Sequence, residues 1–489
     1  MMKKGMIAVL SAAMVMSLTT CPSVFASEEP AAAESTGKQQ ITEVEPYVKL
    51  KYELTSVGEF STEENLRFGY GDVAYVSEGD SYAVVSAFGE KIQSGITSSK
   101  NIGDGHYVVN TPLNEENVNT TGLISMDGTV LIPCEAASIA LPGNREKDGI
   151  RFVAVIYATD KTENEDECII YFTNSMFSFS ISEDDVMYKG YARIYDIQEE
   201  RFVEGIQLDS FGRDSLQDLS DSFVIKGIGG SSKMYDPEGN VIWETTGYLN
   251  DITAHALSVS SGGTYYIVDS AGKDRYRSEA NIGDLNDQLD YFTIYDGDGE
   301  NAKYHAIDID GNRVLDLAQP ILYSACGKYF NTSSDDNGYN VVDEKGNVVI
   351  ENAKSSINVL GSYGYVKMED GSFYLINPDG LYSELEEANI SDLFFGKGDK
   401  AVVLNTGEAS LSFSDTADLR TKGVGLLVAE EQSSSGDYYG AYDLFTGEQI
   451  LPTEYTEINT AGDYIFANRT GSGTNSVWEV YKAELVPAE

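Results

Sequence analysis

Basic side chains are scarce in this sequence of 489 residues. It contains 33 Lys and Arg residues against 79 Asp and Glu residues, which gives a formal net charge of −46. Nucleic-acid phosphates require a basic surface, and anionic lipids attract one, so this composition argues against both kinds of partner. It favours a soluble, self-repelling surface, with attraction for Ca²⁺ or for basic partners as the alternative interpretation.

Residues that bind zinc or form disulfides are also few. The only histidines are His106, His255 and His305, which lie far apart and outside any HExxH or His/Cys cluster, so a catalytic zinc site is not expected. Beyond residue 26 the only cysteines are Cys134, Cys168 and Cys326, an odd number with no CxxC spacing. A Cys134–Cys168 disulfide between repeats is possible in principle, but buried free thiols are the favoured interpretation.

Motifs for nucleophilic or nucleotide chemistry are absent. The sequence has no GxSxG elbow, no Walker loop and no GxGxxG turn. Paired carboxylates for glycoside cleavage can always be assembled from 79 acids, so their presence decides nothing. No catalytic residue and no cofactor are therefore predicted.

The N-terminus has the layout of a secretory signal peptide. Lys3 and Lys4 precede an apolar run that ends near Leu18, and Val24 and Ala26 occupy the small-residue positions before a cleavage site. The run is too short to span a bilayer, and no transmembrane segment follows. We predict a secreted or cell-surface protein cleaved after Ala26, with a mature charge of −48 because two lysines are removed.

A second interpretation of the N-terminus concerns Cys21. The segment Leu18-Thr19-Thr20-Cys21 is similar to a bacterial lipoprotein box, although Thr20 stands where Gly or Ala is preferred. The alternative is therefore a lipoprotein anchored through Cys21. Residues 27–46 are polar and acidic without an apolar period, which predicts a disordered tether in either case.

A repeated hairpin dominates the rest of the chain. In the block Gly338–Ile350, an apolar strand ends in Asp343, a glycine turn follows at Gly346, and a second apolar strand begins. Corresponding turn glycines recur at steps of 27 to 40 residues, apart from one gap of 111. The turn glycines are Gly89, Gly128, Gly239, Gly272, Gly311, Gly346, Gly380, Gly407 and Gly447. Degenerate turns at Asp160–Asp166 and Asp196–Glu200 fill the gap, for a total of 11 repeat turns.

Each repeat holds about four strands, which predicts the fold class. Between Gly338 and Gly371 the expected strands are 339–343, 347–351, 356–360 and 363–368. Four short antiparallel strands per repeat predict an all-β array of four-stranded, β-propeller-like blades. Only Ile282–Leu289 and Tyr382–Phe395 show spacing that suggests short helical insertions.

Eleven blades exceed the usual four to eight of one ring, so two rings are favoured. The predicted division is a signal peptide at 1–26, a tether at 27–46, a first propeller-like domain at 47–250 and a second at 251–489. One large ring and an open curved stack are the alternatives. The segment Tyr47–Leu54 is expected to pair with a later blade, and Val477–Tyr481 is expected to be a closing strand.

Two blocks carry a family resemblance. Tyr439–Ile458 and Gly122–Glu135 each contain a glycine, a strand, a glycine turn and then Leu-Pro or Ile-Pro. This pattern resembles the bacterial WG-repeat family, with Tyr439-Gly440 in place of Trp-Gly; Gly338–Ile350 is a third block, without the proline. The resemblance implies a β-propeller-like fold and a binding or scaffolding role, and it carries no catalytic residue.

Two kinds of binding site can be proposed from residue types alone. Carboxylates two residues apart in glycine-containing loops predict a weak Ca²⁺ site, with a plain hairpin turn as the alternative. The residues concerned are Asp296, Asp298, Glu300, Asp308 and Asp310. Paired tyrosines predict a platform for sugars or peptides, with ordinary strand packing as the alternative. These are Tyr265, Tyr266, Tyr438 and Tyr439.

The function predicted from the sequence is a non-catalytic binding or scaffolding module. Its partner would be a protein or a cell-wall or extracellular glycan at the bacterial surface or in the medium. The alternative is an extracellular polysaccharide hydrolase or lyase built on a propeller.

Overall fold

The structure is a computed structural model. It describes residues 50–69, 73–112, 118–144, 149–164, 168–172, 186–209, 211, 215–227, 231–284, 290–296, 303–317, 325–326, 329–333, 338–342, 348–360, 363–369, 373–377, 381–385, 403–405, 410–412, 418–422, 426–433, 436–443, 449–470 and 475–487. The predicted signal peptide, the Cys21 anchor and the tether lie outside the described residues. So do Asp298, Glu300 and the turn glycines Gly346, Gly380, Gly407 and Gly447.

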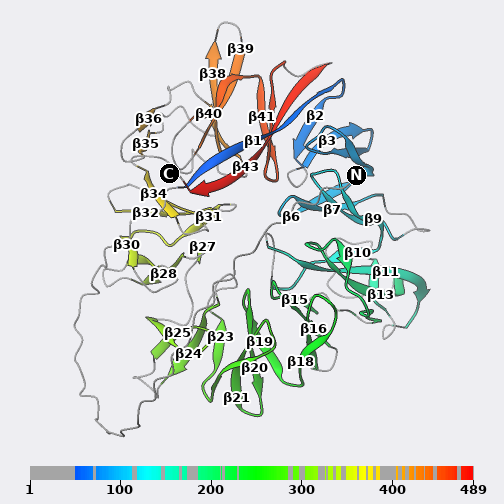
Figure 1. Cartoon of the computed structure of the whole chain (residues 1–489), viewed down its shortest axis with the longest axis vertical. Coiled ribbons are helices and arrows are strands. Elements are labelled where there is room, and N and C mark those ends of the chain that lie inside the picture. Colours follow the sequence, from blue (N-terminus) through cyan, green and yellow to red (C-terminus); the bar gives the residue numbers. More distant parts are fainter. Residues whose placement is uncertain are drawn as a thin grey trace, which may run out of the picture. The chain divides into compact units, whose positions relative to one another are not determined.

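Throughout the described part of the chain, the regular elements are β-strands. They form 11 antiparallel sheets: nine of four strands, one of five and one of two (Figure 1). The chain is therefore an all-β array of four-stranded, β-propeller-like blades, as the sequence predicts. A search of the same residues for a helix long and apolar enough to cross a membrane finds none.

We number the sheets along the chain. Sheet 1 contains β2 (Leu66–Gly69), β3 (Val73–Glu78), β4 (Ser81–Val85) and β5 (Lys91–Ile96); sheet 2 contains β6 (Ser98–Gly103), β7 (His106–Asn110), β8 (Thr121–Ser125) and β9 (Val130–Ala136); sheet 3 contains β10 (Ser138–Ala140), β11 (Phe152–Thr162), β12 (Ile170–Phe172), β13 (Val186–Asp196) and β14 (Arg201–Phe202). Sheet 4 contains β15 (Leu216–Asp218), β16 (Phe223–Lys226), β17 (Ser232–Tyr235) and β18 (Val241–Thr245); sheet 5 contains β19 (Tyr248–Ile252), β20 (Ala256–Ser261), β21 (Thr264–Asp269) and β22 (Asp274–Ser278); sheet 6 contains β23 (Ile282–Asp284), β24 (Phe292–Asp296), β25 (Lys303–Ile307) and β26 (Arg313–Leu317).

The remaining sheets follow in the same order. Sheet 7 contains β27 (Ala325–Cys326), β28 (Tyr329–Ser333), β29 (Tyr339–Val342) and β30 (Val348–Ala353); sheet 8 contains β31 (Asn358–Leu360), β32 (Tyr363–Lys367), β33 (Phe373–Asn377) and β34 (Leu381–Leu385); sheet 9 contains β35 (Val403–Asn405) and β36 (Ser410–Ser412). Sheet 10 contains β37 (Asp418–Lys422), β38 (Leu426–Ser433), β39 (Gly436–Asp443) and β40 (Gln449–Tyr455); sheet 11 contains β41 (Glu457–Ala461), β42 (Tyr464–Asn468), β43 (Ser476–Pro487) and β1 (Leu50–Thr62).

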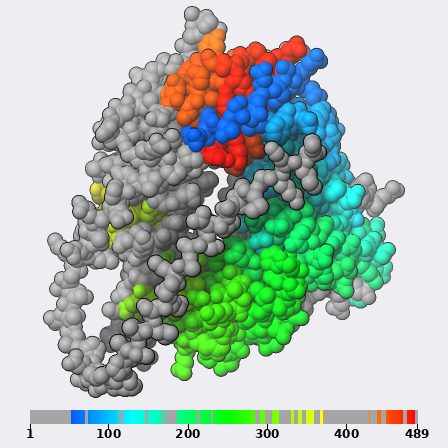
Figure 2. Space-filling model, in the orientation of Figure 1, coloured from blue at the N-terminus to red at the C-terminus, as the bar shows by residue number. Residues whose placement is uncertain are grey.

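Sheet 11 joins the two ends of the described chain. Its outer strand β1 pairs with β43 from Leu50 opposite Pro487 to Thr62 opposite Ser476, with one irregularity near Gly58. The expected pairing of an N-terminal strand with a later blade is therefore observed. Figure 2 shows the blue surface of β1 lying directly against the red surface of the last strands. This pairing covers an edge of β43 that would otherwise stand open.

The core lies between neighbouring sheets. Along β11, Phe152, Ala154 and Ile156 pack with sheet 4, whereas Val153 and Val155 pack with sheet 2. Successive side chains of a strand point to opposite faces, so a strand covered on both sides has to be apolar at every position. Residue 250 lies within β19 of sheet 5, and sheets 4 and 5 share one such cluster. The predicted division into two domains at residue 250 remains a prediction.

The repeat turn has one backbone geometry in five sheets. In sheet 5, Gly272 N–H donates to the Asp269 carbonyl at 2.9 Å and Asp269 N–H donates to the Lys273 carbonyl at 3.0 Å. The turn glycines Gly89, Gly128, Gly239, Gly272 and Gly311 all have φ between +77° and +101°. A glycine in this region, followed by a register shift, forms the bulged hairpin loop that the sequence pattern predicts.

The same glycines also set the contact with the preceding sheet. A Cβ on Gly272 would lie 2.8 Å from the Ile242 carbonyl oxygen of sheet 4. A Cβ on Gly239 would overlap the Glu204 carbonyl oxygen, and one on Gly311 would overlap the Tyr276 ring. The glycine therefore recurs for two reasons, the left-handed backbone and the close approach of two sheets.

The two blocks with the proline share a second feature. Thr121 pairs with Ala136 and Leu123 with Ile132, so the one residue between them in β8 faces the three residues 133–135 of β9, and Pro133 lies in this bulge. Tyr439 and Ala441 face Tyr455 and Leu451 in the same way around Pro452. The glycines beneath these bulges are tightly covered: a Cβ on Gly122 would lie 2.7 Å from the Ile132 carbonyl oxygen, and one on Gly440 would lie 2.7 Å from Thr453 Oγ1. The spacing of glycine and proline in the motif thus reflects a bulge that folds over a glycine.

Two details of the sequence prediction are wrong. The predicted repeat turn at Asp160–Asp166 is not observed in its described part, because β11 continues to Thr162 and pairs with the long strand β13 in a single sheet. Helical insertions were expected at Ile282–Leu289 and Tyr382–Phe395, but the described parts of both are strands, β23 and β34. Short apolar spacings of this length fit a strand and a helix equally well, and pairing with β24 and β33 decides for the strand.

Cys134 carries a free, half-buried thiol, and burial raises its pKa. A Cys134–Cys168 disulfide is therefore not formed. Cys326 lies in β27.

Candidate functional site

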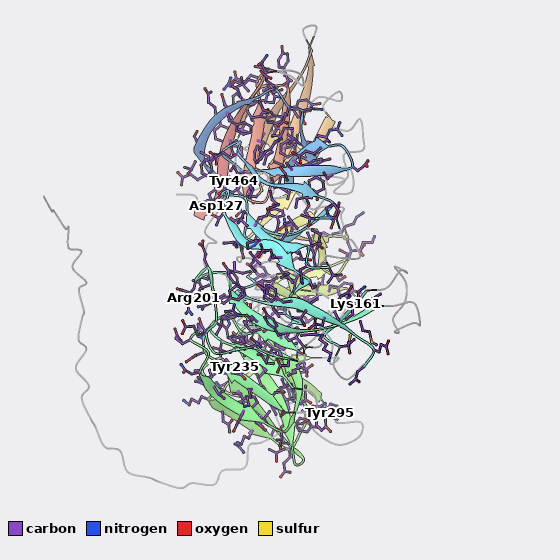
Figure 3. All side chains as sticks on the ribbon, turned by 90° about the vertical axis from the view of Figure 1, so that its right-hand side faces the viewer. Asp127, Lys161, Arg201, Tyr235, Tyr295 and Tyr464 are labelled. Carbon is purple, nitrogen blue, oxygen red and sulfur yellow. The ribbon has the colours of Figure 1, made fainter. Side chains whose placement is uncertain are left out.

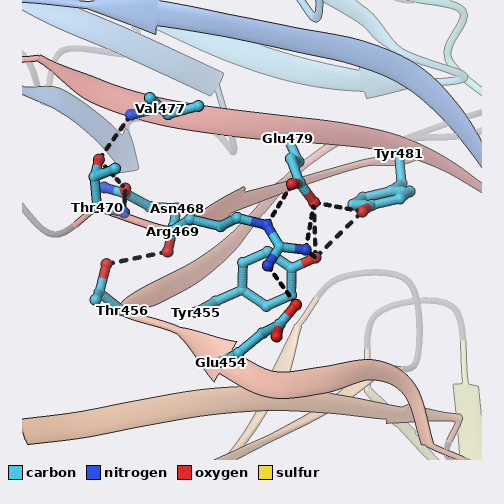
Figure 4. A network of polar contacts seen from close by, with 9 residues as sticks. All are labelled: Glu454, Tyr455, Thr456, Asn468, Arg469, Thr470, Val477, Glu479 and Tyr481. Carbon is cyan, nitrogen blue, oxygen red and sulfur yellow. Dashed lines mark hydrogen bonds and ion pairs between the residues drawn. The ribbon is translucent and has the colours of Figure 1, made fainter.

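A polar cluster centres on Arg469, which follows β42 (Figure 4). Its guanidinium pairs with Glu479 of β43 and with Glu454 of β40, and it lies over the Tyr455 ring with 4.8 Å to the ring centroid. Glu454 and Tyr455 belong to sheet 10, whereas Glu479 belongs to sheet 11. The cluster therefore fastens the closing sheet to its neighbour.

The pKa values of the acidic groups in this cluster are shifted away from neutral pH. Burial disfavours the charge of Glu479, but hydrogen bonds from Arg469, Tyr481 and Tyr455 outweigh it and lower the Glu479 pKa. The hydroxyls of Tyr455 and Tyr481 both donate to Glu479 Oε2, at 2.8 and 2.7 Å. Burial, together with these neighbours, raises the pKa of Tyr455 far above its usual range. Groups whose pKa values are moved away from neutrality are poor general acids or bases.

A second polar cluster is buried between sheets 3 and 4. Asp218, which is fully buried, accepts hydrogen bonds from the backbone N–H groups of Arg151 (2.7 Å), Phe152 (3.1 Å) and Ser220 (2.7 Å). The Arg151 side chain pairs with Asp196, also fully buried, at 3.0 Å. These carboxylates satisfy the backbone at the start of β11 and hold it against β15.

His255 and Asp290 form the pair that most resembles a catalytic dyad. His255 Nδ1 lies 2.8 Å from Asp290 Oδ2, and Asp290 Oδ1 accepts from His255 N–H at 2.8 Å and from Thr253 Oγ1 at 2.9 Å. Burial disfavours the Asp290 charge, but these hydrogen bonds and the nearby imidazole lower its pKa below the usual 3.8. Asp290 precedes β24, so the carboxylate anchors the turn before β20 to sheet 6.

This geometry predicts a pH dependence of stability. Because the folded-state pKa of Asp290 is lowered, its contribution is present above the unfolded value of 3.8 and is lost as the pH falls through the folded value. The free energy of unfolding lost in Asp290→Asn, measured by urea denaturation, should be larger at pH 6 than at pH 3. A loss of equal size at both pH values would contradict the assignment. Thr253→Val keeps the carboxylate and should retain most of the wild-type pH dependence.

Two of the predicted calcium residues, Asp308 and Asp310, are engaged by protein groups. Asp308 Oδ1 accepts from the N–H groups of Asp310 and Asn312, and its Oδ2 accepts from Asn312 Nδ2. Asp310 pairs with Arg275 of sheet 5 at 2.6 Å. The repeat turn accounts for the Asp308 carboxylate, and the ion pair with Arg275 accounts for that of Asp310. Asp296 ends β24, and within the described residues no three His, Cys, Asp or Glu side chains are grouped to hold a metal ion.

The members of each predicted tyrosine pair are consecutive strand residues. Tyr265 packs on the cluster between sheets 5 and 6, whereas Tyr266 packs on the cluster between sheets 4 and 5. The two rings therefore lie on opposite faces of β21, as consecutive strand residues must. Tyr438 and Tyr439 are likewise consecutive in β39, and Tyr439 pairs with Tyr455 across the sheet.

The structure instead places Tyr265 in a row with a tyrosine that the sequence reasoning missed. Tyr248 pairs with Ser260, Ser260 with Tyr265, and Tyr265 with Ser278. Directly paired residues share one face of a sheet, so these four side chains form a line across sheet 5. We call Tyr248, Ser260, Tyr265 and Ser278 the tyrosine row. Ser258, two residues before Ser260, donates to the Ile282 carbonyl of β23, which places the row on the face toward sheet 6.

Tyr248 is the outermost member of the row. Its exposed fraction is 77%, the largest among the large hydrophobic residues in the described part of the chain, whereas Tyr265 is half-buried. A lone tyrosine beside a Gly-containing turn is common in this sequence, so no sequence signal distinguishes Tyr248 from the many buried tyrosines.

The backbone beneath Tyr248 is held by specific contacts. Gly247 N–H donates to Thr245 Oγ1 at 2.9 Å, and Thr245 Oγ1 lies 3.2 Å from the Tyr266 hydroxyl. A Cβ on Gly247 would lie 2.7 Å from the Ser260 carbonyl oxygen, so only glycine allows this close approach. Tyr248 is thus an exposed aromatic residue on a positioned backbone, and Tyr266 contributes from the opposite face.

Comparison with known proteins does not assign this chain to a family. No family model matches the sequence, and no curated protein matches it. Among solved structures, the chain is similar to BamB from Moraxella catarrhalis, with 10% identity, a TM-score of 0.24, and coverage of 88% of this chain and 100% of that one. It is also similar to a computationally designed protein, with 12% identity, a TM-score of 0.22, and coverage of 87% and 98%. Because these identities and TM-scores are low, we infer nothing about the present chain from either protein.

Proposed function

We propose that this protein is an exported, non-catalytic binding or scaffolding module that recognises a protein or a glycan outside the bacterial cell. The observation that carries the proposal is the contrast between its polar clusters and its exposed tyrosine. The clusters around Arg469, Asp218 and Asp290 join one sheet to the next. Tyr248 is instead presented to solvent at the start of β19, where the backbone is held by Thr245.

The chemistry of the chain supports this reading. Carboxylates that are ion-paired or that accept several backbone hydrogen bonds are committed to stability, and they are not free to move protons during a reaction. Exposed tyrosines on rigid elements are common at recognition surfaces, because the ring offers a large contact area at little cost in conformational entropy. The resemblance to WG repeats implies the same role.

Export is part of the proposal. The basic N-terminus, the short apolar run and the cleavage pattern ending at Ala26 support secretion or surface location, with anchoring through Cys21 as the alternative. Mass spectrometry of the N-terminal peptide from the native host decides between them: a peptide that begins at Ser27 supports cleavage, and a lipid on Cys21 supports anchoring.

The binding function is tested with the purified full chain. We expect saturable binding to at least one member of an array of glycans and unstructured peptides, and no release of product from any glycan above a boiled control. Lack of binding by protein whose thermal unfolding is intact would overturn the proposal. Release of product would favour the polysaccharide hydrolase or lyase instead.

A further inference from the structure

The tyrosine row has the composition of a carbohydrate-binding surface. We propose that it binds a short neutral glycan, an inference that rests on the binding function proposed above. The row combines two aromatic rings with the hydroxyls of Ser260 and Ser278, all on one face of sheet 5.

The spacing of the rings suits a chain of sugars. Tyr248 on β19 and Tyr265 on β21 are separated by the single strand β20, which places their backbones about 10 Å apart. One sugar ring does not span this distance, whereas a short oligosaccharide does. The apolar C–H face of a pyranose packs on an aromatic ring, so an exposed ring at one end and a half-buried ring at the other give two stacking positions.

Polar groups lie between the two rings. The Ser260 hydroxyl donates to Asn250 Oδ1 at 3.1 Å, and Asn250 is exposed. This hydrogen bond uses the amide oxygen and leaves the Asn250 NH₂ group to donate outward. Sugar hydroxyls both donate and accept, and a site with a few positioned amide and hydroxyl groups can fix their orientation.

The surroundings of the row disfavour other ligands. Leu249 and Ile252, the aliphatic residues of β19, pack into the core between sheets 4 and 5. Beside Tyr248, the row therefore presents no aliphatic side chain of β19 to the side chains of a peptide. A formal charge of −46 disfavours anionic glycans, which leaves neutral ones.

Binding would require little rearrangement. The contacts of Gly247 with Thr245 and with the Ser260 carbonyl hold the start of β19 before any ligand arrives. A site on a fixed strand loses little entropy on binding, which favours measurable affinity from a small contact area.

The test is isothermal titration of the full chain with neutral hexasaccharides of glucose and of N-acetylglucosamine, with a hexamer of galacturonic acid as the anionic control. We expect a neutral hexamer to bind and the anionic one to bind at least tenfold more weakly. Tyr248→Ala should weaken the binding about tenfold, because one stacking contact is lost. Tyr248→Phe should retain most of the affinity, since the ring remains.

The matched control is Tyr295→Ala. Tyr295, labelled in Figure 3, is 40% exposed on β24 of sheet 6, and its replacement should leave the affinity unchanged. Wild-type affinity in Tyr248→Ala would overturn the assignment of the row, while binding itself would still support the broader function. Binding of peptides but of no neutral glycan would overturn the glycan inference alone. Absence of all binding by folded protein would overturn both.

Discussion

Replacement of Asp218 by alanine is expected to lower the free energy of unfolding by about 3–5 kcal/mol. The carboxylate is fully buried and accepts three backbone N–H groups, from Arg151, Phe152 and Ser220. Alanine would remove the acceptor of all three donors, of which the Phe152 N–H is buried and the other two are partly buried. The measurement is urea denaturation followed by circular dichroism, with the wild type under identical conditions.

Two further variants define the cause. Asp218→Asn keeps the shape but offers one oxygen where two are used, so it should also be strongly destabilised. Asp236→Ala removes a carboxylate whose hydrogen bonds, to Asn240, lie in an exposed turn, and it should cost no more than about 1 kcal/mol. Equal losses in Asp218→Ala and Asp236→Ala would show that burial of the carboxylate is not the reason.

Replacement of Gly272 by alanine is expected to lower the free energy of unfolding by about 2–5 kcal/mol. Gly272 has φ of +77°, which costs an alanine about 1–2 kcal/mol. Its new Cβ would also lie 2.8 Å from the Ile242 carbonyl oxygen of sheet 4, and the required shift of backbone costs about a further 1–3 kcal/mol. The free energy of unfolding should therefore fall by more than backbone strain alone explains.

Gly79→Ala is the matched control for this prediction. Gly79 has φ of +72°, but no atom lies within 4 Å of the position that a Cβ would take. It should show the backbone cost of about 1–2 kcal/mol and no more. If both variants lose the same stability, the close approach of sheets 4 and 5 at Gly272 does not matter, and the second reason given for the repeated glycine is wrong.

The sequence predicts the local structure of this protein well. Each turn glycine that the structure describes has positive φ, because the hairpin depends on residues that are neighbours in the chain. The strands expected at 339–343 and 363–368 correspond to β29 and β32. The grouping is different, because β29 belongs to sheet 7 and β32 to sheet 8. The regular spacing of the turn glycines predicts the length of a repeat, but it does not predict which strand is the last of one sheet and which is the first of the next.

The candidate site is less accessible to sequence reasoning. Tyr265 and Tyr266 are adjacent in the sequence, yet only Tyr265 lies in the row, because alternate strand residues face opposite ways. Tyr248 enters the row through its pairing with Ser260, a contact that depends on the register between two strands. Asp218 is one acid among 79. Its importance comes from burial and from backbone partners in another sheet, neither of which the sequence displays.

The pairing of β1 with β43 constrains the order in which the protein can fold. Leu50 finds its partner only when Pro487 has been synthesised, so the outer strand of sheet 11 waits for nearly the whole chain. Closing so long a loop is entropically unfavourable until the sheets between are formed. The early sheets can assemble as the chain emerges, because each packs on its neighbour, while β1 stays unpaired until the end. A chain that stops short of β43 would therefore leave β1, at the other end of the chain, without its partner strand as well.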